Sequence, residues 1–413
     1  MEKAGRTPNA YPCVTPQIDL MLDGVNVALG VTGSIAAVKT VELAHELRRQ
    51  GASVRALMSE SATGVIHPWA LEFATEHDVV TEITGRVEHV DLCGREGWAD
   101  VLLIAPATAN TVGKIAGAVD DTPVTTTATT ALGADVPVVI APAMHEPMYD
   151  HPGVLDAIDR VESWGVNFVD PRIEEGKAKI ATEEAIVTAT ARATTTQDLA
   201  GRHIVVTGGA TSEAIDPIRV LTNRASGRTG REVARACHIR GAEVTLIHDG
   251  PGVPYADVVE IESAAEMLAA ADAACEDADA MVSAAAIGDY TVQEASAKLR
   301  SGEARTIDLE PTPKVLDSIR QGHPDLTMVG FKAETTGDDE ALFEQATALR
   351  DRVDLAFVVA NDATVMGEAD TRALLVDRAA ESVADCEVVE GSKRLLGNRI
   401  ATQLGDILDS RSP

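Results

Sequence analysis

The chain repeats one local pattern twice, and this repeat limits its fold more than any other feature. Each copy has an apolar strand, a glycine turn and an amphipathic helix, and a further apolar strand follows. Strand–helix–strand units of this kind build parallel sheets with helices on both faces. The pattern therefore predicts an α/β protein with two doubly wound domains. The predicted strand, turn, helix and next strand lie at 25–30, 31–34, 35–50 and 53–58 in one copy, and at 203–207, 208–212, 228–240 and 243–247 in the other.

Further apolar runs extend both sheets. Aromatic residues make up only 3% of the chain, so the cores must consist of Ala, Val, Leu and Ile, which suits strands buried on both faces. Small polar residues at 189–198 favour a linker, with the domain boundary near residue 195. We expect a loose arm at 1–20, a first domain at 21–190, a linker at 191–200 and a second domain at 201–413. The additional predicted strands are 101–105, 136–141, 280–284, 327–331 and 355–360.

The net charge of −30 bears on the partners of the chain. Such a charge repels nucleic acid and anionic membranes, so we expect neither as a partner. Acidic residues are spread along the chain and Arg outnumbers Lys. An ordinary acidic cytosolic protein and a halophilic protein both have this character, and we favour the halophile. The five scattered cysteines, the lack of a membrane-spanning run and the absence of a signal-peptide core before Pro16 indicate the cytoplasm.

The first glycine turn has the features of a phosphate site. In open α/β sheets, ligands bind at the carboxyl ends of strands, beside the positive ends of helices. Gly33 lets the backbone approach a ligand closely, and Ser34 adds a hydroxyl donor. The second strand does not end in an acidic residue that could bind an adenosine ribose. A mononucleotide is therefore favoured over a dinucleotide, although a turn that merely caps a helix would have a similar sequence.

The loops after the next two strands also consist of small residues, at 105–111 and 141–149. Together with the first turn they predict a flat slot, as an isoalloxazine ring requires. His89 precedes the third strand and is a candidate general base, although a lone histidine is more often structural or simply exposed.

These motifs resemble the phosphopantothenoylcysteine decarboxylases, which are FMN proteins with a flavodoxin-like fold. The matching pieces are Gly-x-Thr-Gly-Ser-Ile-Ala-Ala, His-x-Asp-Leu…Trp-Ala-Asp, Ala-Pro-Ala-Thr-Ala-Asn-Thr and Pro-Ala-Met. The resemblance implies that His89 is the catalytic base of a decarboxylation in which hydride passes to the flavin and back. It also implies that Gly33, Ser34, Ile35 and Ala36 hold the FMN phosphate, and that Ser59, Ala107, Thr108 and Asn110 line the flavin.

Two positions depart from the decarboxylase pattern. His145 stands where the family commonly has the Asn that binds the substrate carboxylate. The segment 176–180, which we align with the flap of the family, lacks the usual proton-donating cysteine and has Lys179 in its place. Lys179 is thus a candidate proton donor, and a solvated lysine is the alternative. An insertion at 93–97 also lengthens the loop after His89.

The second half contains a functional loop. Asn, Arg and Ser residues crowd the segment 215–230 after the second glycine turn, although a solvated surface turn would also be polar. Asp289 at a strand end and the cationic Lys298 and Arg300 suit nucleotidyl transfer, in which cations offset triphosphate charge and a carboxylate helps to hold Mg2+.

The same half resembles the phosphopantothenate–cysteine ligases across 203–362, with a Rossmann-like fold. Thr-Gly-Gly-Ala-Thr-Ser-Glu, Ile-Asp-Pro-Ile-Arg, Thr-Asn-Arg-Ala-Ser-Gly-Arg-Thr-Gly, Gly-Phe-Lys-Ala-Glu-Thr and Val-Ala-Asn-Asp match in order. By this resemblance Asn223 orients an acyl-CMP intermediate, Lys298 serves its turnover, and Asp289 meets the metal. Asn361 and Asp362 match without an assignable role. The implied CTP contacts are Ser283, Ala284, Ala285, Asp289, Lys298, Pro313, Lys314, Val315, Leu316 and Phe331.

The two resemblances together imply one bifunctional enzyme of coenzyme A biosynthesis. Phosphopantothenate and cysteine would be joined at the expense of CTP, and phosphopantothenoylcysteine would then be decarboxylated. A homo-oligomer with ligase dimers and decarboxylase trimers is implied as well. Two alternatives stay open for the first half: a flavin-binding regulatory subunit, or a prenyl-FMN-forming flavoprotein.

Overall fold

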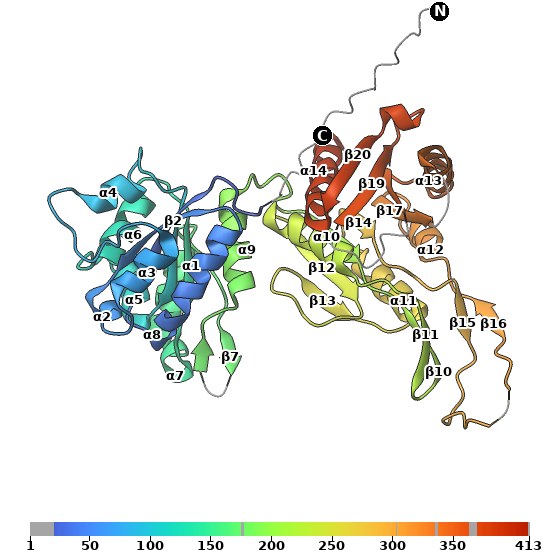
Figure 1. Ribbon diagram of the computed structural model, residues 1–413, viewed down its shortest axis with the longest axis horizontal. Helices are drawn as coiled ribbons and strands as arrows, with labels where there is room; N and C mark the ends of the chain where they lie inside the picture. Colours follow the sequence, from blue (N-terminus) through green and yellow to red (C-terminus); the bar gives the residue numbers. More distant parts are fainter. Residues whose placement is uncertain (1–19, 175–176, 303, 335–337, 363–369, 412–413) are drawn as a thin grey trace, which may run out of the picture.

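The computed structural model describes residues 20–174, 177–302, 304–334, 338–362 and 370–411, so the arm expected at 1–20 lies almost wholly outside it. Figure 1 shows two α/β domains that meet near α9. Among the described residues, no helix is long and apolar enough to cross a membrane. The elements of the first domain are β1 Asn26–Val31, η1 Ile35–Lys39, α1 Thr40–Arg49, β2 Ser53–Met58, α2 Glu60–Thr63, α3 Pro68–Thr75, α4 Glu88–Cys93, β3 Val101–Ala107, α5 Ala109–Ala116, α6 Pro123–Gly133, β4 Val138–Pro142, β5 Met144–His145, α7 Glu146–Tyr149, α8 Pro152–Glu162, β6 Asn167–Phe168, β7 Arg172–Glu174, β8 Lys177–Lys179 and α9 Glu183–Thr194.

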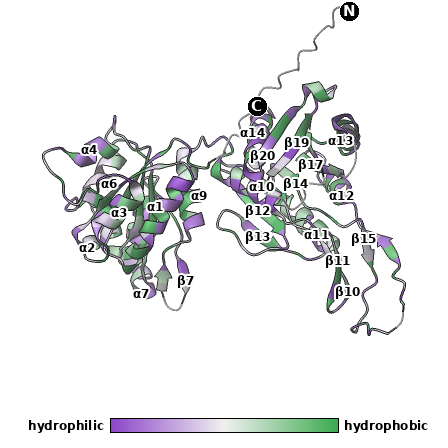
Figure 2. Cartoon of the chain, viewed as in Figure 1, coloured by the Kyte–Doolittle hydropathy of each residue, from purple (hydrophilic) through white to green (hydrophobic). Residues whose placement is uncertain are grey.

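The first domain is a doubly wound parallel sheet with the strand order β2-β1-β3-β4-β6, which is the flavodoxin order. Successive residues of β1 face opposite layers. Val27 and Leu29 pack with Leu43 of α1, whereas Ala28 packs with Val112 of α5. Because both faces are covered, the strands are continuously apolar, as the sequence predicts. Figure 2 shows green, the colour of hydrophobic residues, along the central strands of both domains.

The first helix differs from its predicted form in one respect. It begins as the 3-10 helix η1 and becomes the α-helix α1 at Thr40. The Ser34 hydroxyl accepts the Ala36 N–H, and the Ala37 N–H bonds to the Ser34 carbonyl, so the first turn is wound more tightly than an α-helix.

The second domain has an eight-stranded sheet of order β13-β12-β9-β14-β17-β18-β19-β20. The first six of these strands are parallel and β19 and β20 are antiparallel, an extension that the sequence does not predict. The elements are β9 His203–Thr207, β10 Ser212–Asp216, β11 Arg219–Thr222, α10 Arg228–Ile239, β12 Glu243–His248, β13 Asp257–Glu260, α11 Ala264–Ala274, β14 Ala280–Ser283, β15 Tyr290–Val292, β16 Leu309–Pro311, α12 Val315–Gly322, β17 Thr327–Glu334, α13 Asp339–Val353, β18 Phe357–Asp362, β19 Asp370–Asp377, η3 Val383–Asp385, β20 Glu387–Ser392 and α14 Lys393–Arg411.

Two ribbons extend from this domain (Figure 1). β10 pairs with β11 and β15 pairs with β16, both antiparallel. The polar segment predicted as a loop at 215–230 is therefore partly a ribbon. The backbone N–H and C=O groups of these short strands bond to one another across each ribbon. The sequence pattern alone does not reveal this pairing.

The first part of the linker expected at 191–200 is helical, and the rest is turn and irregular structure. α9 continues to Thr194, and Arg192 donates hydrogen bonds to the carbonyls of Gly241 (3.0 Å) and Ala242 (3.2 Å) after α10. Ile239 of α10 packs into the core cluster of the first domain. Small residues are compatible with this helix because Ala has the highest helix propensity. The connection between the domains is therefore a packed joint.

His238 lies in this joint and makes its stability depend on pH. Burial, with the nearby Arg192 guanidinium, lowers the pKa of His238 from 6.5 to about 4. The unfolded chain binds the His238 proton more readily than the folded chain does. The contribution of His238 to the free energy of unfolding is therefore highest above pH 6.5 and decreases as the pH falls toward 4. We expect His238→Gln, which keeps an acceptor for Arg192, to lose less of its Tm than the wild type over that range. Parallel declines of Tm in differential scanning calorimetry would contradict this.

Candidate active sites

Three strand-end loops of the first domain are joined by hydrogen bonds. The Thr32 hydroxyl donates to the Pro106 carbonyl (2.8 Å) and accepts the Thr108 N–H (3.2 Å). The Ser34 hydroxyl donates to the Ala143 carbonyl (3.1 Å). The loops after β1, β3 and β4 thus form one rigid edge, at the end of the sheet where ligands of this fold bind.

A cavity of about 580 Å3 opens at this edge. Its volume lies within the range of roughly 300–1,000 Å3 that is usual for organic ligands, and its mostly apolar wall suits a planar ring. It contains many of the predicted site residues. The lining residues are Gly33, Ser34, Ile35, Ala36, Val38, Lys39, Thr108, Ala143, Met144, His145, Met148, Ala178, Lys179 and Ile180.

The segment that we align with the flap contains the strand β8, which is antiparallel to its neighbours. β8 pairs with β7 and also with β5, where Met144 faces Ala178. This pairing brings the half-buried Lys179 and the exposed His145, which are far apart in the sequence, to the same cavity. The two departures from the decarboxylase pattern therefore lie together.

Three other predicted flavin residues do not line the cavity. Ser59 is buried at the start of α2, where its N–H donates to the Val31 carbonyl (3.0 Å). Ala107 is buried at the end of β3, and Asn110 is exposed on α5. Ala107 accepts the Ala143 N–H (2.9 Å), so Ser59 and Ala107 both contribute backbone hydrogen bonds to the rigid edge.

His89 lies on α4 and is also absent from the lining of the cavity. The side chain is half-buried, and its Nδ1 is buried with no hydrogen-bond partner in the described part of the chain. The insertion at 93–97 folds into a tight turn, because Trp98 N–H bonds back to the Asp91 carbonyl (2.9 Å) and Ala99 N–H to the Leu92 carbonyl (2.8 Å). The longer loop thus closes directly onto α4.

A second cavity, of about 240 Å3, lies at the carboxyl ends of β14 and β17 in the second domain. Two threonine hydroxyl groups hold the loop after β14 on one side of this cavity. The Thr207 hydroxyl accepts the Ala285 N–H (3.3 Å), and the Thr211 hydroxyl accepts the Gly288 N–H (2.8 Å). Eight predicted CTP residues line the cavity together with six others. The lining residues are Ser283, Ala285, Ile287, Gly288, Asp289, Thr312, Pro313, Lys314, Val315, Leu316, Asp317, Phe331, Leu349 and Arg352.

The remaining predicted ligase residues adjoin this cavity or lie away from it. The Ala284 N–H donates to the Thr207 carbonyl (3.1 Å). Asn223 donates to the Ala286 carbonyl (2.5 Å) and accepts the Ala225 N–H (3.1 Å), so it joins the loop after β11 to the loop after β14. Lys298 is exposed on the segment between β15 and β16 and does not line the cavity. Asn361 lies in β18, while the side chain of Asp362 is outside the described part of the structure.

Asp289 forms an ion pair with Lys314 (2.8 Å), and both side chains are exposed. Within the described ranges there is no group of three His, Cys, Asp or Glu side chains that could hold a metal ion. A Mg2+ ion at Asp289 would therefore depend on phosphate oxygens of the substrate, which is how proteins usually bind this ion.

Several residues that line the two cavities were not predicted from the sequence. Lys39 follows Ala36 by three residues in the first helix, and this helical spacing places it on the same face. Arg352 and Asp317 come from α13 and α12 and form an ion pair at the second cavity. No local motif marks them, because their position depends on the packing of two helices.

The comparison with known proteins assigns a family to each half. Residues 18–195 match the Flavoprotein family, and residues 199–407 match the DNA/pantothenate metabolism flavoprotein C-terminal domain. The Coenzyme A biosynthesis bifunctional protein CoaBC of Thermococcus kodakarensis is 47% identical, with 86% of this chain and 90% of the relative covered. The proteins of that name from Methanocaldococcus jannaschii and Bacillus subtilis are both 33% identical, and the match covers 94% and 84% of this chain and 96% and 88% of those relatives. On this evidence the chain belongs to the family of bifunctional coenzyme A biosynthesis proteins.

Proposed function

We propose that the second domain joins phosphopantothenate to cysteine at the expense of CTP, and that the first domain decarboxylates the product with FMN to give phosphopantetheine. The chain is a bifunctional enzyme of coenzyme A biosynthesis, as its family membership indicates. The observation that carries the proposal for the first domain is the 580 Å3 cavity, because the glycine turn, His145 and Lys179 line it together.

In the first domain, each lining group has a chemical task in this proposal. Gly33 to Ala36 and the Ser34 hydroxyl would hold the FMN phosphate, with Thr108 beside the ring. FMN would supply the acceptor for a hydride from the cysteine moiety. His89 would take the proton, and His145 would orient the substrate carboxylate in place of the Asn of the family. Ser59, Ala107 and Asn110 would complete the flavin surroundings.

Lys179 is the proposed donor of the last proton, and a substitution separates this role from a charge effect. We expect Lys179→Ala to keep FMN but to form phosphopantetheine about a hundredfold more slowly. Lys179→Arg keeps the positive charge yet holds its proton too tightly to donate it, so it should be nearly as slow. Mass spectrometry of the products measures both rates. Wild-type formation of phosphopantetheine by Lys179→Ala would remove the donor role.

In the second domain, the cavity beside β14 and β17 would hold CTP, with Phe331 against the nucleotide and Asp289 toward Mg2+. Asn223 would orient the acyl-CMP intermediate, because its amide already joins two of the loops at this edge. Lys298 would approach from the exposed segment between β15 and β16 and offset the phosphate charge.

One assay on the full chain tests the function. CTP, Mg2+, phosphopantothenate and carboxyl-labelled cysteine should give both pyrophosphate and labelled CO2. Pyrophosphate without CO2, from a chain that has bound FMN, would favour a flavin-binding subunit fused to a ligase. Transfer of a prenyl group to FMN would favour the prenyl-FMN alternative. Without pyrophosphate, the ligase proposal fails.

A homo-oligomer, with trimers of the first domain and dimers of the second, is also part of the proposal. Apolar side chains are exposed beside the flavin cavity, among them Ile35 (79% exposed), and on α3, where Trp69 (72%) and Phe73 (77%) lie one turn apart. Tyr290 and Leu309 are exposed on the ribbons of the second domain. Exposed apolar groups of this kind favour contacts between subunits. A molar mass of one chain in light scattering would contradict the proposal.

Three broader proposals rest on the sequence. We propose the division at 21–190, 191–200 and 201–413, and two family matches that end at residue 195 and begin at residue 199 support two domains that divide within 191–200. A cytoplasmic location is consistent with the coenzyme A pathway. A halophilic source is supported by the net charge of −30, since a carboxylate-rich surface is expected to need salt. A Tm that falls as KCl is raised to molar levels would contradict the last of these.

A further inference from the structure

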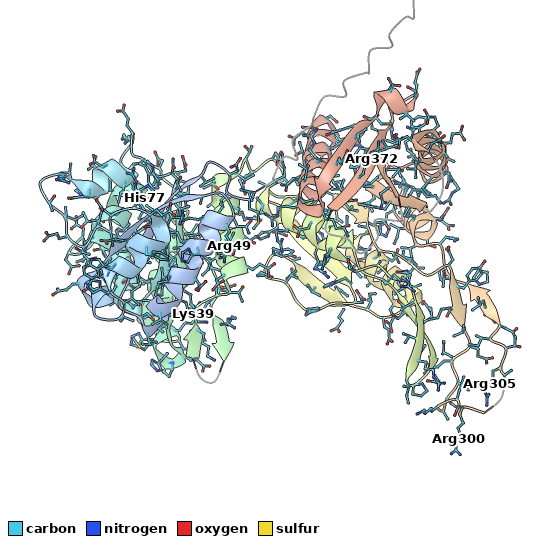
Figure 3. All side chains as sticks on the ribbon, viewed as in Figure 1. Lys39, Arg49, His77, Arg300, Arg305 and Arg372 are labelled. Atoms are coloured by element: carbon cyan, nitrogen blue, oxygen red, sulfur yellow. The ribbon has the colours of Figure 1, made fainter. Side chains whose placement is uncertain are left out.

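The segment that carries Lys298 is irregular and mostly exposed. It runs from Gln293 to Gly302 between β15 and β16, and Leu299 is one of its two half-buried residues. Figure 3 shows Arg300 and Arg305 at the outer end of this part of the domain, far from the central sheet. Without an anchor, an exposed segment of this kind would not hold a side chain in one place.

Asp216 and Arg219, at the β10–β11 turn, supply such an anchor. The Leu299 N–H donates to Asp216 Oδ2 (3.0 Å), and Arg219 Nη2 donates to the Leu299 carbonyl (3.0 Å). Arg219 Nη1 donates to the same Asp216 oxygen (2.7 Å). The carboxylate, the guanidinium and both backbone groups of Leu299 therefore form one closed ring of hydrogen bonds.

The carboxylate of Asp216 is itself rigidly held. Its side chain is fully buried, whereas that of Arg219 is 46% exposed. Its Oδ1 accepts the N–H groups of Ile218 and Arg219, both at 2.9 Å. Burial alone would raise the pKa of Asp216, but the N–H donors of Leu299, Ile218 and Arg219 and the Arg219 charge outweigh it and lower that pKa. The anchor is thus ionised and fixed before any ligand binds.

A second backbone hydrogen bond fixes the start of the segment. The Ala295 N–H donates to the Ile215 carbonyl (3.0 Å), directly before Asp216. Lys298 lies between this point and Leu299. Its Cα is therefore one residue, about 3.8 Å, from a residue whose N–H and C=O are both bound.

We propose that Asp216 and Arg219 are positioning residues of the ligase reaction: they clamp the backbone of Leu299 and so hold Lys298 where it serves the CTP-dependent step. The inference rests on the proposed function only for the role of Lys298. The hydrogen bonds of Asp216 and Arg219 to Leu299 do not depend on the proposed function.

The central test combines Asp216→Asn with Lys298→Ala on the full chain. Asp216→Asn replaces the charged acceptor of the Leu299 N–H and should lower kcat for pyrophosphate formation about tenfold or more, since a charge-assisted hydrogen bond is lost. The KM for CTP should change no more than it does in Lys298→Ala, because Asp216 does not line the cavity and acts on CTP only through Lys298. The double variant should be no slower than Lys298→Ala alone, as expected when one residue acts through the other.

Hydrogen–deuterium exchange of the peptide 293–302 gives a readout that does not involve catalysis. Asp216→Asn should speed its exchange about tenfold, whereas Lys298→Ala should leave it unchanged. Thr291→Val is the matched control, since it removes the hydrogen bond from Thr291 to Glu213 (2.7 Å) between β15 and β10 without touching Leu299. If Asp216→Asn does not fold, Arg219→Met, which keeps the buried carboxylate, takes its place with the same expectations.

The outcomes separate the clamp from the proposed function. Unchanged exchange in Asp216→Asn, or losses that multiply in the double variant, would overturn the positioning role. Full activity of Lys298→Ala, together with faster exchange in Asp216→Asn, would instead leave the clamp intact and remove the proposed task of Lys298.

Discussion

A chain with His89→Asn is expected to bind FMN and to release pyrophosphate at the wild-type rate, yet to release CO2 from phosphopantothenoylcysteine at least about a hundredfold more slowly. The reason is that general acid–base catalysis by a histidine contributes about a hundredfold to ten-thousandfold. His89 Nδ1 is buried without a partner in the described residues, which is unusual for a histidine that has only a structural role.

Labelled CO2 and pyrophosphate, measured on the same preparation, check this expectation. The ligase activity of the second domain is the internal control, since His89 lies on α4 of the first domain. Decarboxylation at the wild-type rate would show that His89 is structural. An equal loss of both activities would mean that the substitution damages the whole chain.

The second large effect is expected from Gly33→Ala, which should weaken FMN binding by about a hundredfold, or roughly 3 kcal/mol. A Cβ at residue 33 would lie 2.4 Å from Ser61 Oγ and 2.6 Å from Ser61 Cβ. These distances force the turn away from α2. The turn also carries Ser34, whose hydroxyl joins it to the loop after β4, so the rigid edge of the cavity would be disturbed.

The absorbance of bound flavin in the purified protein measures this effect. Gly113→Ala on α5 is the matched control, because a Cβ there would have no neighbour within 4 Å. A yellow Gly33→Ala protein with normal FMN content would contradict the phosphate role of the turn. Pyrophosphate formation should persist in both variants.

The two variants also test the proposed assembly together. His89 does not line the cavity of its own chain. If His89 of one copy served the cavity of another, a mixed oligomer of His89→Asn and Gly33→Ala chains would regain CO2 release, since it would contain sites with both FMN and His89. Mixing that restores no activity after exchange of subunits would place His89 and the flavin of each active site in one chain.

The sequence predicts the features of this fold that depend on near neighbours. The apolar strands β1, β2, β9 and β12 and the turns at Gly33 and Gly208 follow from local pattern, because buried parallel strands need continuous apolar residues and tight turns need glycine. The family of both halves and the strand-end position of the cavities could be predicted on the same grounds.

Features that depend on distant pairing could not be predicted. The β8 strand pairs with β5, and β19 and β20 add antiparallel edges, although none of these strands has a distinctive pattern. Arg352 reaches the second cavity from α13. The clamp on Leu299 joins residues 83 positions apart in the chain. In each case the partner is fixed by tertiary packing, which local propensity does not encode.

The packed joint between α9 and α10 has an evolutionary consequence. A gene split near residue 195 would separate Arg192 from the carbonyls that it binds and would expose Ile239, which belongs to the core of the first domain. Either half made alone would therefore lose these contacts at its surface. The joint therefore favours keeping the two enzymes on one chain, because a split would cost both halves stability at this surface.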